Sequence, residues 1–159
     1  MRKFLLFLIA FVCLHGLVWA QGKGIEFRLI CTSEMIKCDK VYDPNAKTEI
    51  SVDTNVVLSN QDIEKAEVKE VDLLATYHKS KGIPLRLEPR LYIYFTKQGK
   101  EKLLKITSEN VNKRLAVFLD SEFLLAPTIA EPVKLGQLEL NGLTKEKAEK
   151  IAAQVNAQK

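Results

Sequence analysis

The sequence has few of the residues on which common catalytic and metal sites depend. Its 159 residues include two His, three Cys and one Trp. No Gly-x-Ser-x-Gly, glycine-rich phosphate loop or His-Glu-x-x-His occurs, so the signatures of serine hydrolases, nucleotide-binding enzymes and zinc peptidases are missing. We therefore expect no enzymatic activity, no cofactor and no metal site.

Glycine, proline and an excess of charge of one sign are also scarce. Seven Gly and five Pro argue against a low-complexity chain, and 47% hydrophobic with 28% charged residues is typical of an ordinary globular protein. The 24 basic and 20 acidic residues leave a net charge of +4, too small and dispersed to indicate nucleic acid as the main partner. The length suits a single domain.

The longest apolar run lies at the amino terminus. Two basic residues precede the apolar stretch 4–14, and small residues follow at the positions that signal peptidase reads, up to Ala20. This pattern predicts a signal peptide over residues 1–20, cleaved before Gln21; the alternative is an uncleaved membrane anchor. The run is short for a membrane span and no basic cluster follows it, which favours cleavage. We expect the mature domain, residues 21–159, to be periplasmic or secreted.

Two cysteines remain in the predicted mature domain. Six residues separate Cys31 from Cys38, and in an oxidising compartment such a pair is expected to form a disulfide. A redox site would favour two intervening residues, and a zinc site needs four ligands where only His78 remains to join the thiolates. A structural disulfide is therefore the favoured interpretation, with the histidine a solvated residue near the end of a strand.

Apolar alternation predicts a series of short strands. It indicates a hairpin with a polar turn at 79–84 and a return at 85–95, and a second hairpin around Asp120-Ser121-Glu122. Pro127 within the last return predicts a sheet edge or a bulge, because proline cannot donate to a strand ladder. Residues 31–47 are predicted to form a loop. The other predicted strands are 25–30, 50–52, 56–58, 71–78, 91–95, 115–119, 123–129 and 137–140.

Three segments have helical signals. Ser59 followed by Asp62 resembles a capping box and predicts a short helix with Ile63 and Ala66 on one face. A second helix is predicted over 98–114, and a third after the cap residue Thr144. The apolar face predicted for the second helix consists of Leu103, Leu104, Ile106, Thr107 and Val111. The pattern as a whole predicts an α+β domain: a largely antiparallel sheet with about three helices packed on one face.

Binding to another protein is the function that the residues favour. Tyr92 and Tyr94 alternate with the apolar residues of strand 91–95, so they either form an amphipathic outer stripe or lie in a core beneath a helix. The sheet edge predicted at Pro127 is a second place where a partner strand could add.

An ordered series of segments resembles the head subdomain of SecD, the membrane protein that assists bacterial protein translocation. The series begins near residue 26 and covers most of the predicted mature domain. The matching positions are 26–29, 57–59, 62, 63, 65, 66, Phe95-Thr96, Gly99, 106, 107, 110, 111, 113–117, 119, 120, 126, 127, 129, Glu131-Pro132-Val133, 136–138, 140–144, 146 and 148.

The resemblance implies a role without catalysis. It implies a domain that contacts an emerging polypeptide on the far side of the membrane. The alternative is a structural or adaptor subunit of a cell-envelope assembly that keeps this fold and has no role in secretion. We expect the head alone, without the base domain and transmembrane helices that carry the proton pathway in that family. The candidate protein-binding residues are Tyr92, Tyr94, Pro127, Glu131 and Pro132.

The chain departs from the family pattern at three turns and one insertion. Asn112 and the central residue of Asp120-Ser121-Glu122 stand where the family has glycine, which leaves the turn type open. A glycine-rich spacer is shortened to Lys134-Leu135, and the stretch 71–90 is an insertion of this chain.

Overall fold

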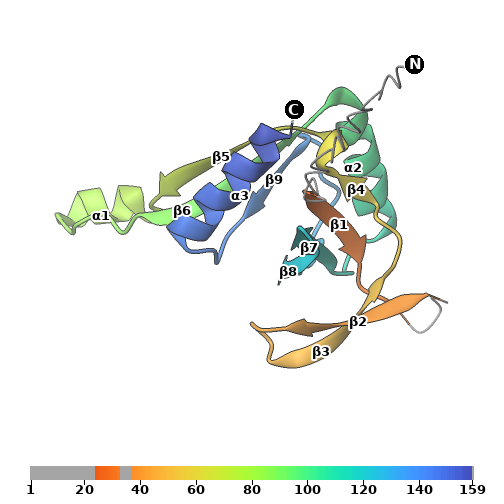
Figure 1. Cartoon of the computed structure of the whole chain (residues 1–159). Coiled ribbons are helices and arrows are strands. Elements are labelled where there is room, and N and C mark those ends of the chain that lie inside the picture. Colours follow the sequence, from red (N-terminus) through yellow and green to blue (C-terminus); the bar gives the residue numbers. More distant parts are fainter. Residues whose placement is uncertain (1–23, 33–36, 159) are drawn as a thin grey trace, which may run out of the picture.

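The structure of the protein is a computed structural model that describes residues 24–32 and 37–158. The predicted signal peptide and its cleavage site between Ala20 and Gln21 lie outside these residues. Within the described part, nine strands form three antiparallel sheets accompanied by three α-helices, which confirms the α+β class (Figure 1). The strands are thus divided among separate sheets and do not form one continuous sheet.

The central sheet has four strands in the order β4-β1-β7-β8. These are β1 (Ile25–Leu29), β4 (Leu58–Ser59), β7 (Leu115–Leu119) and β8 (Glu122–Leu125). All five residues of β7 are buried, as the sequence predicts for a strand without polar alternation. The strand β8 lies at one edge and ends just before Pro127, which confirms the predicted sheet edge.

A second sheet of three strands packs beside it. Its order is β5 (Ile63–Val71), β6 (Glu88–Phe95) and β9 (Gln137–Leu140). One face is apolar: Leu91, Ile93 and Phe95 are fully buried. The helix α3 (Lys145–Ala157) contacts β5 and β6, and its buried residues are Ala148, Ile151, Ala152 and Val155. The Thr144 side chain accepts from the Lys147 amide, so the predicted cap is confirmed.

The helix α2 (Lys97–Glu109) ends before the position that its sequence predicts. The predicted end at 114 is wrong because the amide of Asn112 donates to Ile129 O (2.8 Å), which draws the chain into pairing with a distant segment. The predicted apolar face is only partly correct. Leu103 and Thr107 are buried, whereas Leu104 and Val111 are exposed.

The capping box at Ser59 exists, but the helix predicted after it does not. The Ser59 amide donates to Asp62 Oδ2 (3.0 Å) around a single 3₁₀ turn, Asn60–Asp62, and β5 follows directly. A register shift between Ile63 and Lys65 inserts an extra residue into this strand. Such a bulge brings Ile63 and Ala66 to the same buried face although they are three residues apart, a spacing that imitates a helix.

The predicted strand 71–78 and polar turn 79–84 are also wrong. This stretch contains the helix α1 (Ala75–Lys81), which lies at the far end of the long hairpin of β5 and β6 (Figure 1). The predicted return strand is confirmed from Glu88 onward, but its hairpin partner is β5, with Val71 paired to Glu88 at the outer end. His78 is a buried helical residue hydrogen-bonded to Asp72, and the prediction of a solvated strand-end histidine is incorrect.

The predicted loop 31–47 includes a strand. β2 (Cys38–Asp43) pairs with β3 (Thr48–Asp53) in a two-stranded hairpin that extends away from the central sheet (Figure 1). The expected disulfide joins Cys31 to Cys38, with their Cα atoms 6.3 Å apart. It ties the start of this hairpin to the end of β1.

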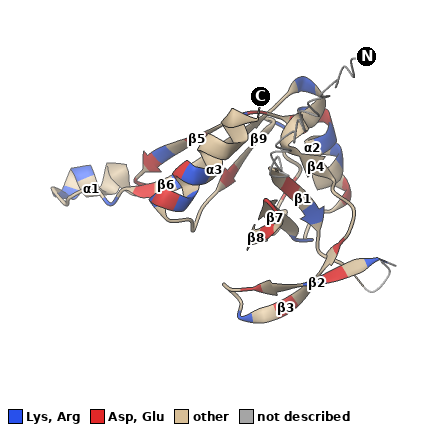
Figure 2. Ribbon diagram, viewed as in Figure 1, with Lys and Arg blue, Asp and Glu red and all other residues tan. Residues whose placement is uncertain are grey.

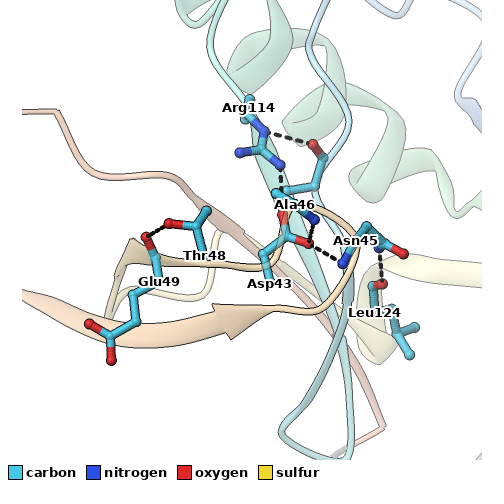
Figure 3. A network of polar contacts seen from close by, with 8 residues as sticks. Asp43, Asn45, Ala46, Thr48, Glu49, Arg114 and Leu124 are labelled. Carbon is cyan, nitrogen blue, oxygen red and sulfur yellow. Dashed lines mark hydrogen bonds and ion pairs between the residues drawn. The ribbon is translucent and has the colours of Figure 1, made fainter.

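The turn of this hairpin is fixed to the central sheet by Asp43 (Figure 3). Its carboxylate accepts from the amides of Asn45 (3.0 Å) and Ala46 (3.1 Å) and from the Arg114 guanidinium (3.1 Å). Burial alone would raise the pKa of Asp43, but these three donors outweigh it and lower the pKa. The guanidinium also donates to the Ala126 carbonyl, so one arginine joins the turn to the end of β8.

The two positions where the family pattern has glycine and this chain does not, Asn112 and Ser121, both have a backbone conformation that favours glycine. Asn112 has φ = 66°, and Asp120 and Ser121 have φ = 49° and 71°. Positive φ at both central residues is what a two-residue type I′ hairpin turn requires. The turn between β7 and β8 therefore keeps a conformation suited to glycine without containing one.

Candidate polypeptide-binding groove

The candidate site lies at the free side of β9. This strand is the outer member of its sheet, and β6 is its only strand partner among the described residues. Beside it, the irregular segment 127–133 runs from the edge of the central sheet toward α2. The two stretches enclose a hollow between the two sheets, which we call the groove.

Hydrogen bonds hold the segment 127–133 in place on the side away from β9. Its Pro127 carbonyl accepts from the Leu115 amide (2.9 Å), and the Ile129 amide donates to Lys113 O (2.8 Å). At its other end the Val133 amide donates to Oγ1 of Thr107 (2.9 Å), a hydroxyl that itself donates to Leu103 O (2.7 Å). The outer wall of the groove is therefore a fixed part of the fold.

The groove is mainly apolar and contains two adjoining hollows. The inner one has a volume of about 210 Å³ and a floor formed by Phe27, Val117, Leu138 and Leu140. The outer one, of about 470 Å³, shares Glu131, Val133 and Glu139 with it and continues past Pro132 and Lys134. Leu135, at its outer end, is 81% exposed. Apolar surface beside the edge strand of a sheet suits the binding of an extended peptide segment.

Tyr92 and Tyr94 do not line the groove, and they lie on the face of the three-stranded sheet opposite to its apolar face. Both are half-buried, which confirms the outer stripe and excludes the alternative that a helix covers them. Ammonium groups of β5 cover their rings: Lys65 Nζ is 4.6 Å from the Tyr94 centroid, and Lys69 Nζ is 5.0 Å from that of Tyr92.

One carboxylate organises the polar contacts on this outer face. Glu67 accepts from Lys69 Nζ (2.8 Å) and from the Tyr94 hydroxyl (2.6 Å). These hydrogen bonds lower the pKa of Glu67 to about 2, and the one from Lys69 has the larger effect. Burial, followed by the nearby charge of Glu139, raises the pKa of Tyr92. Tyr92 therefore stays a neutral hydrogen-bonding group.

The predicted binding residues thus separate into two sets. Pro127 and Glu131 line the inner hollow, and Glu131 and Pro132 line the outer one. Tyr92 is paired with Glu139 of β9 in the sheet register, and Glu139 lines both hollows. The face that bears the tyrosines therefore adjoins the groove. Val133 and Leu138 also line the inner hollow but were not among the predicted binding residues, although both fall in the segments that resemble SecD.

No group of three or more His, Cys, Asp or Glu side chains is placed to hold a metal ion within residues 24–32 and 37–158. Over the same residues, no helix has the length and apolar character needed to cross a membrane.

The family model for the SecDF P1 head subdomain matches residues 33–159. This chain belongs to that family. It is 37% identical over 65 residues to the SecDF translocase subunit of Thermus thermophilus, a match that covers 40% of this chain and 9% of the relative. It is 38% identical over 71 residues to the SecD subunit of Calditerrivibrio nitroreducens, covering 44% of this chain and 14% of that relative. The matches thus span a small part of each relative.

Solved structures of SecDF share the fold of this head domain. The structure of SecDF in its super-membrane-facing form superposes with a TM-score of 0.61 at 22% identity, covering 84% of this chain and 18% of that one. A structure of SecDF described as a membrane component that enhances protein export gives a TM-score of 0.59, also at 22% identity, with coverage of 86% and 64%. At this identity the likeness concerns the fold alone.

Proposed function

We propose that this SecDF head domain is an exported, non-enzymatic domain that binds unfolded or translocating polypeptide in the groove beside β9. One observation carries the proposal: in a domain of the SecDF P1 head family, an apolar hollow adjoins the outer edge of β9, which has no strand partner within the described residues. Related proteins are translocase subunits, which makes a polypeptide in transit the natural ligand class.

The dimensions of the groove suit a transient contact. The inner hollow of about 210 Å³ is smaller than the roughly 300–1,000 Å³ typical of small-molecule pockets, so it accommodates individual apolar side chains. Burying one large apolar side chain contributes about 1.5–3 kcal/mol. Backbone hydrogen bonds to β9 would add affinity without depending on sequence. Such a site binds many polypeptides weakly and releases them.

The proposed location of the domain rests on the predicted signal peptide at the amino terminus. Cleavage of the signal peptide between Ala20 and Gln21 would release the head domain into the periplasm or the medium. There the disulfide between Cys31 and Cys38 is stable, because disulfides persist in oxidising compartments.

Filling the groove tests the proposal. Ala130 is exposed and lines the inner hollow, so Ala130→Trp should occupy the hollow without disturbing the core. Binding of a fluorescently labelled, permanently unfolded polypeptide, measured by anisotropy, should weaken by an order of magnitude or more. The matched control is Ala153→Trp on the exposed side of α3, which should bind like the original chain. Equal affinity in the two variants, or no binding by the original chain, would refute the groove as the binding site.

A second candidate is an adaptor role in an envelope assembly, with a partner strand added to β8. The observation that favours it is the position of β8 at the edge of the central sheet. Photo-crosslinking probes distinguish the two functions in cells. Products from Lys134, at the outer hollow, should be diverse exported chains if the groove binds polypeptide. One dominant folded partner, captured from Ser121 beside β8, would support the adaptor role instead.

A further inference from the structure

The far end of the β5–β6 hairpin exposes an unusual number of large apolar side chains. We define the tip as residues 72–87, which include α1. Six of its large apolar residues are between 42% and 68% exposed: Leu73, Leu74, Tyr77, Ile83, Leu85 and Leu87. They make up more than half of the exposed large apolar residues of the described chain. Isolated exposed apolar residues are ordinary, but a cluster of this size marks an interaction surface.

The exposed charges of the tip all have one sign. Residues 73–87 include Lys79, Lys81 and Arg86 and contain no Asp or Glu. Figure 2 shows this end of the molecule in blue and tan, with red appearing only where the hairpin strands begin. Exposed apolar side chains and cations are therefore interspersed along the tip.

The one carboxylate of the tip is turned inward. Asp72 Oδ2 accepts from the Arg86 amide (2.9 Å) and contacts Nδ1 of His78 (2.7 Å), while Oδ1 accepts from the Leu74 amide (2.8 Å). The side chains of Asp72 and His78 are only 3% and 8% exposed. These bonds close the tip into a small ordered unit and remove its negative charge from the surface.

From this arrangement we propose that the tip docks on the surface of an anionic lipid bilayer. Apolar and aromatic side chains interleaved with lysine and arginine are what an interfacial segment needs: the first enter the boundary between headgroups and acyl chains, and the second pair with anionic headgroups. The tip projects beyond the other elements, so it can reach a flat surface without obstruction (Figure 1).

Docking in this way leaves the polypeptide groove open. The strand β9 pairs with residues 91–94 of β6, whereas the tip lies beyond the opposite end of that strand, at Glu88. The proposal therefore does not rest on polypeptide binding, and either can fail without the other. A bilayer contact would hold the head domain at a membrane with its groove turned to solvent.

A single tryptophan reports the contact directly. The sequence has one Trp, Trp19, so the full chain with Trp19→Phe provides a background without tryptophan. In that background Tyr77→Trp places the probe on the tip. Its matched control is Tyr42→Trp, the same change at a tyrosine of β2 with 59% exposure, against 53% for Tyr77. The control also reports any attachment through residues 1–20.

On addition of phosphatidylcholine vesicles containing one-third phosphatidylglycerol, the Tyr77→Trp emission should shift to shorter wavelength, and the Tyr42→Trp emission should not. Lys79→Gln and Lys81→Gln should each weaken binding about fivefold, and higher salt should weaken it further. Leu73→Asp with Leu87→Asp should abolish the shift. Both leucines are exposed, so the circular dichroism of this variant should be unchanged.

Three results would overturn the proposal. The first is no shift with anionic vesicles, and the second is an equal shift with pure phosphatidylcholine, which would remove the role of the cations. The third is a shift that appears without vesicles as protein concentration rises, with dimers in sedimentation analysis. In that case a second copy of this chain, and not a bilayer, covers the tip.

Discussion

Oδ2 of Asp72 lies 2.7 Å from Nδ1 of His78, and both side chains are almost completely buried although they belong to the most exposed part of the fold. The hydrogen bond from His78, more than those from the Arg86 and Leu74 amides, lowers the pKa of Asp72 below its ordinary value of 3.8. This pair connects the last residues of β5 to α1 and gives the tip its order.

The pair predicts an acid-sensitive tip. Because the pKa of Asp72 is lower in the folded chain than in the unfolded chain, its ionised form stabilises the tip above pH 3.8, and this contribution is lost as the pH falls through the folded value. Asp72→Asn should make amide hydrogen exchange across α1 faster at neutral pH and reduce its dependence on acid. Asp39→Asn, at an exposed position of β2, should leave exchange in α1 unchanged. Equal exchange in both variants would show that the pair does not order the tip.

The outer tyrosine face predicts a second titration. Glu67 should remain ionised down to about pH 2, because Lys69 and the Tyr94 hydroxyl donate to its carboxylate. In carboxyl-carbon NMR titrations Lys69→Met should raise the pKa of Glu67 more than Tyr94→Phe does, since the lysine is the stronger cause. A titration midpoint near 4.5 in the unmodified chain would contradict the network.

The disulfide and the signal peptide predict one mass. Protein recovered from the cell envelope should begin at Gln21 and weigh two hydrogens less than the fully reduced chain, as intact-mass spectrometry can establish. Cys31→Ser with Cys38→Ser should lower the free energy of unfolding by about 2–3 kcal/mol, the range expected for closing a short loop. Free thiols on the native protein would exclude the disulfide, and a mass that includes residues 1–20 would indicate the membrane anchor.

Substitution by glycine should have opposite effects at Ser121, in the turn between β7 and β8, and at Ser108, in α2. Ser121 has φ = 71°, a conformation that costs a non-glycine residue about 1–2 kcal/mol, so Ser121→Gly should raise the free energy of unfolding by about 1 kcal/mol. Ser108→Gly, at an exposed position of α2, should lower it by about 0.5–1 kcal/mol. Urea unfolding measures both. A loss of stability at Ser121 would show that the backbone there is not strained.

Replacing Gly99 by alanine should destabilise the fold, although alanine has the higher helix propensity. The glycine lies in the first turn of α2, where an added Cβ would overlap the Asp62 carbonyl, the oxygen that accepts from the Thr96 amide (2.9 Å). Alanine favours a helix by about 1 kcal/mol over glycine, yet Gly99→Ala should destabilise the fold by more than that gain. Gln98→Ala, exposed beside it, should be neutral or slightly stabilising. Equal stabilities in urea would refute the close contact.

This contact also gives a physical basis for the Phe-Thr-x-x-Gly motif at 95–99. The Phe95 side chain is fully buried, Oγ1 of Thr96 accepts from the Gly99 amide (3.0 Å), and the glycine permits close approach of α2 to the turn that precedes β5. Each position of the motif therefore serves the joint between a strand and a helix.

Patterns that report local structure were read correctly from the sequence. The apolar run 115–119 has no polar alternation because both faces of β7 are covered, and Thr144 precedes α3 because a helix start needs a side-chain acceptor. The spacing of Cys31 and Cys38 sufficed to predict their disulfide, since a pair so close along the chain is also close in space. Strand periodicity predicts that Tyr92 and Tyr94 share one face, but only the structure shows that this face is partly exposed.

The predictions that failed depended on contacts that join one structural element to another. The bulge in β5 arises from pairing with β6, the end of α2 from pairing of Asn112 with Ile129, and the burial of His78 from a hydrogen bond to Asp72 across the base of the tip. None of these features produces a periodic pattern of apolar residues in the sequence. Each depends on a partner residue that lies outside the helix or strand concerned.

The sequence by itself determined the α+β class, most of the strands, the disulfide and membership of the SecDF head family, since these depend on periodicity, spacing and ordered motifs. Only the tertiary structure decided that the segment 127–133 and the free side of β9 enclose a groove. It also decided that the tip turns its one carboxylate inward and its leucines outward. Both features require two sheets and a hairpin to be packed first, because burial and exposure are properties of the assembled surface and not of the local sequence.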